Sequence, residues 1–185
     1  MYNIGFKSSL KVDTTKPPNT PIIFPINTIS GHPIAIGGRT LQNNSFMAKY
    51  INSPETRFFK KGNNLYNIDR ARRLSSKSDY IFLVEGYMDV IGLSKNKIEN
   101  SVANLGTALT ERQILMLNQF FNEVIICFDG DDSGYKAAVR AAENCIRELK
   151  PEKHISFLFL KDGDDPDSFV NKNVTLRVQT APFDK

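Results

Sequence analysis

Residues 80–90, YIFLVEGYMDV, and residues 123–131, EVIICFDGD, decide the fold of this chain. In each stretch a short run of aliphatic and aromatic residues is followed at once by an acidic residue and a glycine. Such runs are typical of strands that are buried on both faces of a parallel sheet. Strand-like and helix-like segments alternate, which predicts an α/β fold with helices on both faces of that sheet. We expect strands at 80–84, 101–104, 123–128 and 155–160, and helices at 87–94, 111–121 and 135–149.

Two of the expected helices carry local signals. Thr110 precedes the second helix and Gln113 lies three residues later, which is the spacing of a capping box. In the third helix, small and apolar residues recur at steps of four and predict one narrow buried stripe. The stripe consists of Ala137, Ala141, Cys145 and Leu149.

The chain before Asp79 has a different character. Residues 1–20 contain several prolines and no apolar period, so we expect a flexible arm there. Residues 21–78 are expected to form a small basic α+β lobe, because Lys and Arg outnumber the acids between Arg39 and Arg73. Within it we expect a β-hairpin that joins 22–26 to 33–36 around the turn 30–32, with a break at 37–39.

Composition limits the class of protein. A chain of 185 residues with 41% hydrophobic content can bury a sizeable core. No apolar stretch approaches the length of a membrane span and the first residues do not resemble a secretory signal, so we expect a cytoplasmic protein with no membrane partner. Cys127 and Cys145 are far apart and flanked by apolar residues, which favours buried thiols over a zinc site or a disulfide.

Acidic residues follow three of the expected strands. Glu85 follows the first strand, Asp129 and Asp131 follow the third, and Asp165 and Asp167 follow the fourth. Ligands of parallel sheets bind beyond the carboxyl ends of the strands, so these side chains should meet at one edge. Two carboxylates 4 Å apart repel by about 4 kcal/mol at an effective dielectric of 20, which calls for a cation. Mg²⁺ or Mn²⁺ fits oxygen ligands, and the chemistry indicated is phosphoryl or nucleotidyl transfer.

Other interpretations of residues 129–136 can be tested on spacing. The opening DGDDSG imitates a calcium-binding EF-hand loop, but its twelfth position is Arg140, where a glutamate belongs. The run from Gly130 to Lys136 is too short for a phosphate-binding P-loop. A phosphatase with Asp129 as nucleophile and Asp131 as acid stays open, although it gives Glu85 no role.

Four motifs together resemble the Toprim module of bacterial DnaG-type primases. They are EGYMDV at 85–90, NLGTALT at 104–110, CFDGD at 127–131 and DGDDPD at 162–167. Upstream segments resemble the basic lobe that precedes Toprim in primases. These segments are IFPI at 23–26, GGR at 37–39, KYINSPET at 49–56 and FKKGNNLY at 59–66.

The resemblance spans residues 21–170 and implies a Toprim module at 79–170, followed by an irregular tail at 171–185. It implies a DNA primase, which is a DNA-directed RNA polymerase that makes short RNA primers from ribonucleoside triphosphates on single-stranded DNA during replication. Mg²⁺ or Mn²⁺ is the implied cofactor. Glu85, Asp129 and Asp131 are the implied catalytic residues.

Further site residues follow from the same resemblance. Glu85, Asp129, Asp131 and Asp167 are implied as metal ligands, with Asp165 and Asp89 close by. The implied contacts to template or nucleotide phosphates are Arg39, Lys49, Asn52 and Lys61.

The resemblance does not continue beyond Val170. Primases of this family also carry a zinc module, a helical lobe that closes the catalytic core and a domain that binds the replicative helicase, so we expect a fragment of the catalytic core. Two other functions stay open. One is a Toprim-type metal-dependent nuclease, and the other is an inert DNA-binding remnant of a primase.

Overall fold

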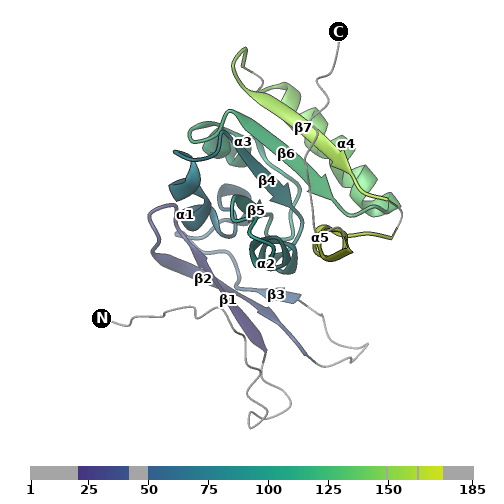
Figure 1. Ribbon diagram of the computed structural model, residues 1–185. Coiled ribbons are helices and arrows are strands. Elements are labelled where there is room, and N and C mark those ends of the chain that lie inside the picture. The colour runs from purple at the N-terminus through teal and green to yellow at the C-terminus, as the bar shows by residue number, and fades with distance from the viewer. Residues whose placement is uncertain (1–20, 42–49, 149, 162, 173–185) are drawn as a thin grey trace.

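Two sheets organise the protein (Figure 1). The computed structural model describes residues 21–41, 50–148, 150–161 and 163–172. An antiparallel sheet has the order β1-β2-β3, and a parallel sheet has the order β5-β4-β6-β7. The antiparallel sheet lies beside helix α2, below the parallel sheet in Figure 1. The expected α/β architecture is confirmed, whereas the expected arm at 1–20 and the tail beyond Lys172 lie outside the described residues.

The strands of the parallel sheet agree with the sequence prediction to within one residue at each end. Because successive side chains point to opposite faces, Ile81 and Leu83 enter one hydrophobic core while Phe82 and Val84 enter the other. All of the pairings between neighbours are parallel. The strands are β4 (Tyr80–Val84), β5 (Ser101–Ala103), β6 (Glu123–Phe128) and β7 (His154–Phe159).

Helices pack on both faces of the parallel sheet. The first core contains side chains from α1, α3 and α4, and the second contains side chains from α2 and α5. The capping box is confirmed: the Thr110 hydroxyl accepts from the Gln113 N–H, and Gln113 Oε1 accepts from the Thr110 N–H at 3.0 Å. The helices are α1 (Ile68–Ala71), α2 (Tyr87–Lys95), α3 (Glu111–Asn118), α4 (Asp132–Ile146) and α5 (Pro166–Lys172).

Helix α4 departs from its prediction. It begins at Asp132 instead of Tyr135, because Asp131 caps it by accepting a hydrogen bond from the Gly134 N–H. Ala141 and Cys145 of the predicted stripe are buried, but the fully buried positions before them are Gly134 and Ala138 instead of Ala137, which is only partly buried. The predicted stripe was therefore wrong at Ala137, where the buried residue is its neighbour Ala138. Leu149 lies outside the described residues.

The antiparallel sheet contains the predicted hairpin. Its strands are β1 (Ile22–Asn27), β2 (Pro33–Arg39) and β3 (Tyr50–Asn52), and Gly31 in the turn has φ +93°. The predicted break at Gly37–Arg39 is wrong, because these residues continue β2 and pair with both β1 and β3. The Tyr87 ring occupies the space in which a Gly37 side chain would lie, so the glycine at this position of β2 serves close packing instead of a break in the strand.

A third hydrophobic cluster joins the two sheets. Phe24 and Ile26 of β1 pack with Phe59, Tyr87 and Leu105, and all of these side chains are buried. Two short 3₁₀ turns, η1 (Lys61–Asn63) and η2 (Arg72–Leu74), complete the connection to β4. None of the helices among the described residues has the length and apolar character that a bilayer crossing needs.

Close packing at Gly134 gives a test of the fold. A Cβ at this position would overlap the carbonyl oxygen of Asp129. We expect Gly134→Ala to lower the free energy of unfolding by about 1–3 kcal/mol, because helix α4 would be forced away from the loop after β6. Urea denaturation measures the change. Ser133→Ala, at an exposed neighbour, is the matched control and should stay within about 0.5 kcal/mol of wild type; equal stability of Gly134→Ala and wild type would contradict the packing.

Candidate metal centre

Acidic side chains follow three adjacent strands at one edge of the parallel sheet. Glu85 follows β4, Asp129 follows β6, and Asp165 lies beyond the end of β7. Since β4, β6 and β7 are neighbours in that order, the three loops share one edge. The Asp129 N–H donates a long hydrogen bond of 3.4 Å to Glu85 Oε1, so the structure brings this pair together.

Asp89 joins these acids from the first turn of helix α2. Its Oδ2 accepts a 2.9 Å hydrogen bond from the Gly86 N–H, which turns the carboxylate back toward the loop after β4. Burial, reinforced by the negative charges of Asp129, Asp165 and Glu85, raises the pKa of Asp89 to about 7. These interactions place Asp89 within the electrostatic reach of the strand-end acids.

The acids raise one another's pKa. Burial is the main reason that the pKa of Asp129 rises to about 6, and the charges of Glu85, Asp165 and Asp131 add to it. The pKa of Glu85 is also raised, by burial and by Asp131, although the Asp129 N–H partly offsets the effect. Each ionised carboxylate therefore destabilises its neighbours at neutral pH.

The donor set at this edge fits a hard divalent cation. Asp129 Oδ1 is buried and receives no hydrogen bond from the described residues. A buried acceptor without a donor, surrounded by carboxylates of raised pKa, is stabilised when a cation binds. Oxygen ligands of this kind match Mg²⁺ or Mn²⁺.

The carboxylates of three predicted ligands accept hydrogen bonds from nearby protein groups. Asp131 Oδ1 caps α4 through the 2.7 Å bond from the Gly134 N–H, and Asp165 Oδ1 caps α5 through the Ser168 N–H at 2.6 Å. Asp167 Oδ1 accepts from Asn171 Nδ2 at 2.7 Å. Among the described residues, no three acidic, His or Cys side chains come close enough to form a complete metal-ligand group. In each of these three aspartates the hydrogen bond uses Oδ1, and Oδ2 accepts none of the three bonds.

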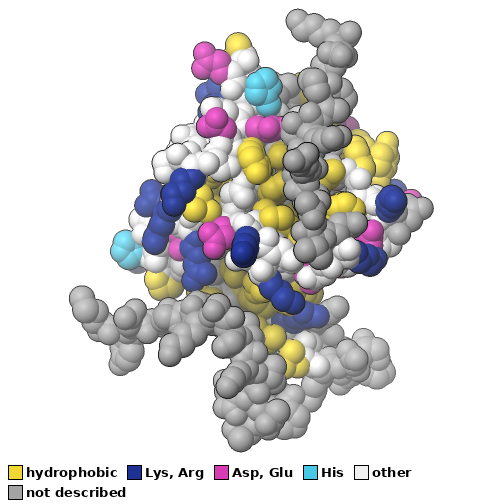
Figure 2. Space-filling view, in the orientation of Figure 1, with side chains coloured by type: hydrophobic (Ala, Val, Ile, Leu, Met, Phe, Trp, Pro, Cys, Tyr) yellow, Lys and Arg dark blue, Asp and Glu magenta, His cyan; other side chains and the backbone are white. Residues whose placement is uncertain are grey.

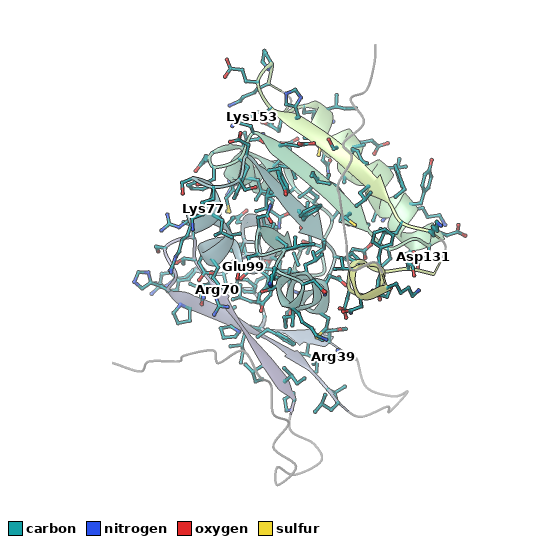
Figure 3. The ribbon with its side chains drawn as sticks, in the orientation of Figure 1. Arg39, Arg70, Lys77, Glu99, Asp131 and Lys153 are labelled. Atoms are coloured by element: carbon teal, nitrogen blue, oxygen red, sulfur yellow. The ribbon has the colours of Figure 1, made fainter. Side chains whose placement is uncertain are left out.

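A cationic and an aromatic side chain pair across β2 and β3 of the antiparallel sheet, at Arg39 and Tyr50. The Arg39 guanidinium lies over the Tyr50 ring, 5.5 Å from its centroid. Burial raises the pKa of Tyr50, the charge of Arg39 lowers it, and the charges of Asp89 and Asp165 raise it further. In Figure 3, Arg39 lies below α2 and Asp131 lies at the start of α4. Figure 2 shows Lys and Arg side chains spread across the middle of the same view, with Asp and Glu side chains among them.

The remaining predicted nucleic-acid contacts lie on different elements of the structure. Asn52 ends β3, where its amide bonds to Tyr87 and Leu105. Lys61 lies in η1, near the start of α3, and its carbonyl accepts a hydrogen bond from Gln113 Nε2. Lys49 lies outside the described residues.

Sequence reasoning assigned no site role to two tyrosines, and for Tyr50 it left a packing role open. Tyr50 stands beside Lys49 in a segment already interpreted as basic, and Tyr87 stands two residues after Glu85. The proximity of each to a predicted site residue was a signal, but their orientation depends on how the two sheets pack. That packing has no local signature in the sequence.

Comparisons with known proteins identify relatives of both sheets. A family model described as a Toprim domain matches residues 79–159, and one described as the N-terminal domain of the DNA primase catalytic core matches residues 16–72. The DNA primase of Pseudomonas aeruginosa is 47% identical over 149 residues, which are 80% of this chain and 22% of that protein.

Solved structures show the same similarity. The crystal structure of a DNA primase domain from Pseudomonas aeruginosa has a TM-score of 0.78 and 46% identity, covering 83% of this chain and 47% of that one. A DnaG primase catalytic domain bound to ssDNA has a TM-score of 0.77 and 40% identity, covering 83% of this chain and 49% of that one. The chain thus spans about a quarter of the length of the curated relatives it matches and about half of the solved domains.

The raised pKa values predict how the stability of the metal-free protein depends on pH. Because the folded state binds more protons than the unfolded state between the usual pKa of an aspartate and about 6–7, stability should fall as pH rises through this window and then level off. At pH 7.5, Asp129→Asn should therefore stabilise the metal-free protein by about 1–2 kcal/mol, allowing for solvent screening.

Thermal unfolding in EDTA and in Mg²⁺ measures both effects. Mg²⁺ should raise the melting temperature of wild type more than that of Asp129→Asn. Glu152→Gln, an exposed acid away from this edge, is the control and should respond as wild type does. A destabilised Asp129→Asn variant in EDTA would contradict the electrostatic account.

Proposed function

This chain belongs to the family of DnaG-type DNA primases, and from that premise we propose that it forms the part of the catalytic core that joins ribonucleotides on a single-stranded DNA template. The observation that carries the proposal is that Glu85 and Asp129 meet at one edge of the parallel sheet, with the Asp89 carboxylate turned back toward the same loop. A polyanionic substrate whose reacting phosphates need a cation suits such an acidic edge. Its place of action is then the cytoplasm, where replication proceeds in bacteria.

The proposal assigns binding of phosphates and catalysis to two units of the chain. We propose a basic lobe at residues 21–78 and a Toprim catalytic module at 79–170, close to the segments matched by the two family models. Helix α5 ends at Lys172, two residues beyond the proposed boundary.

The strand-end acids are the proposed catalytic residues. Glu85, Asp129 and Asp131 would hold Mg²⁺ or Mn²⁺, with Asp89, Asp165 and Asp167 as further ligands or supporting acids. A bound divalent cation would lower the pKa of the primer hydroxyl and neutralise charge on the triphosphate. The chain's own residues position these groups: β4 and β6 fix Glu85 and Asp129 at adjacent strand ends, and α2 brings Asp89 to the same edge.

The basic lobe is the proposed nucleic-acid and nucleotide surface. Arg39, Lys49, Asn52 and Lys61 would bind the phosphates of the template and of the ribonucleoside triphosphate. The family relative solved with ssDNA supports a single-stranded template as the partner. Contacts to phosphates position a strand without reading its sequence.

Synthesis of RNA by the chain tests the proposed activity. With ssDNA, Mn²⁺ and labelled ribonucleotides, we expect elongated RNA on a denaturing gel, and a loss on the order of 100-fold in Asp129→Ala, because the transition-state charge loses its stabilisation. Glu152→Gln, an exposed acid in a turn, should retain the wild-type rate.

The same gel separates the alternatives. Shortened DNA would indicate a Toprim-type nuclease. Salt-sensitive DNA binding with neither product, and with unchanged metal binding in Asp129→Ala, would indicate an inert DNA-binding remnant.

A second experiment tests the basic lobe. Arg39→Ala should weaken ssDNA binding at all sequences and reduce the slope of log affinity against log salt by about 0.7–1, since one phosphate contact is lost. Fluorescence anisotropy at several salt concentrations measures the slope. Arg147→Ala, at an exposed arginine paired with Glu111 on another surface, is the matched control. An unchanged slope in Arg39→Ala would remove this residue from the interface.

A further inference from the structure

The hydroxyl of Tyr87 lies where the two sheets meet. It donates a 2.5 Å hydrogen bond to Asn52 Oδ1, at the end of β3. Asn52 Nδ2 in turn donates to the carbonyl oxygen of Leu105 at 3.0 Å, in the loop that follows β5. One amide side chain therefore connects the antiparallel sheet to the first turn of α2 and to the loop after β5.

The space around this hydroxyl is closely filled. A Cβ added to Gly37, which pairs with Asn52 across β2 and β3, would lie 2.7 Å from the Tyr87 hydroxyl oxygen. The Tyr87 ring stacks on Phe24 with centroids 4.9 Å apart and an interplanar angle of 5°, and it meets the edge of Tyr66 at 4.8 Å. Aromatic packing thus holds the Tyr87 ring, whereas its hydroxyl makes the hydrogen bond to Asn52.

We propose that Tyr87 is a positioning residue, which acts through Asn52 to hold the basic lobe in register with the acidic edge. The interlobe latch consists of the Tyr87 hydroxyl, the Asn52 amide and the Leu105 carbonyl. This inference rests on the proposed function, because it concerns how the same site binds a nucleotide.

Chain connectivity explains why this latch matters to the site. Tyr87 lies two residues after Glu85, and Gly37 lies two residues before Arg39 on the same strand. A shift at the latch therefore changes the separation between a proposed metal ligand and a proposed phosphate contact. Small displacements of positioning groups have large effects on reactions that depend on alignment.

The orientation of Asn52 also changes its proposed role. Both heavy atoms of its amide already have protein partners, so each retains capacity for only one further hydrogen bond. The Asn52 amide is thus held in one orientation by two hydrogen bonds. A nucleotide that bonds to it meets a group whose rotation has already been restricted, which reduces the entropy cost of binding.

Removing the hydroxyl alone tests the proposal. In Tyr87→Phe the ring keeps its stacking, so the melting temperature should stay close to wild type. Exchange of the Asn52 side-chain amide protons, followed by NMR of the labelled full chain, should accelerate about tenfold. Affinity for a fluorescent ATP analogue in Mg²⁺ should fall about fivefold, while Mn²⁺ affinity in the absence of nucleotide stays unchanged.

A double-mutant cycle separates positioning from independent binding. If Tyr87 acts through Asn52, adding Tyr87→Phe to Asn52→Ala produces no further loss of nucleotide affinity. If the double variant loses affinity by the product of the two single losses, the proposal is overturned. Wild-type nucleotide affinity in Tyr87→Phe would overturn it as well. Tyr80→Phe, at a partly exposed tyrosine that packs edge-on against Phe82, is the matched control and should behave as wild type.

Failure of the proposed function gives a different result. A wild-type chain that binds no nucleotide contradicts the proposed function and the role of the latch together, even where the amide protons of Asn52 are protected. A wild-type chain that binds nucleotide, with an equally tight Tyr87→Phe variant, contradicts the latch alone.

Discussion

The partial burial of carboxylates side by side at the ends of parallel strands is the constraint on which the rest of this structure depends. Because β4 and β6 are adjacent and parallel, Glu85 and Asp129 leave the sheet at the same edge, and the buried strands hold their backbone there. Burial, and after it the charges of neighbouring acids, raises the pKa of Glu85 and of Asp129. A divalent cation bound at this edge would offset both effects, so the arrangement of the strands would contribute to its affinity.

The two hydrophobic cores make this arrangement rigid. Strands β4 and β6 are buried on both faces, with α3 and α4 on one side and α2 and α5 on the other. Small residues bring the loops close to the sheet: a Cβ at Gly130 would overlap the carbonyl oxygen of Lys161, so the loop after β6 touches the loop after β7. The Gly130 N–H also donates to the Asp164 carbonyl at 2.8 Å. The acids are therefore carried by backbone that is fixed by packing and by hydrogen bonds.

Sequence patterns predicted those parts of the fold that depend on local order. The apolar runs located β4 and β6 with their true ends, and the Thr110–Gln113 spacing located the start of α3. Prediction failed where a residue depends on distant partners. Gly37 resembles a strand breaker until the Tyr87 ring is placed against it, and Gly134 becomes a buried contact only when α4 packs on the loop that contains Asp129.

The candidate site also has features that the sequence predicts and features that it does not. Convergence of Glu85 and Asp129 followed from topology alone, since parallel strands must end together. The electrostatic effect of Asp89 and Asp165 on Tyr50 did not, because it depends on how the third hydrophobic cluster packs one sheet against the other. That cluster shares Tyr87 and Leu105 with the interlobe hydrogen bonds, so the apolar contacts that join the sheets also fix the direction of Asn52. Apolar contacts resist separation but tolerate sliding, whereas hydrogen bonds depend on direction. The cluster therefore holds the sheets together, and the polar bonds within it determine their alignment.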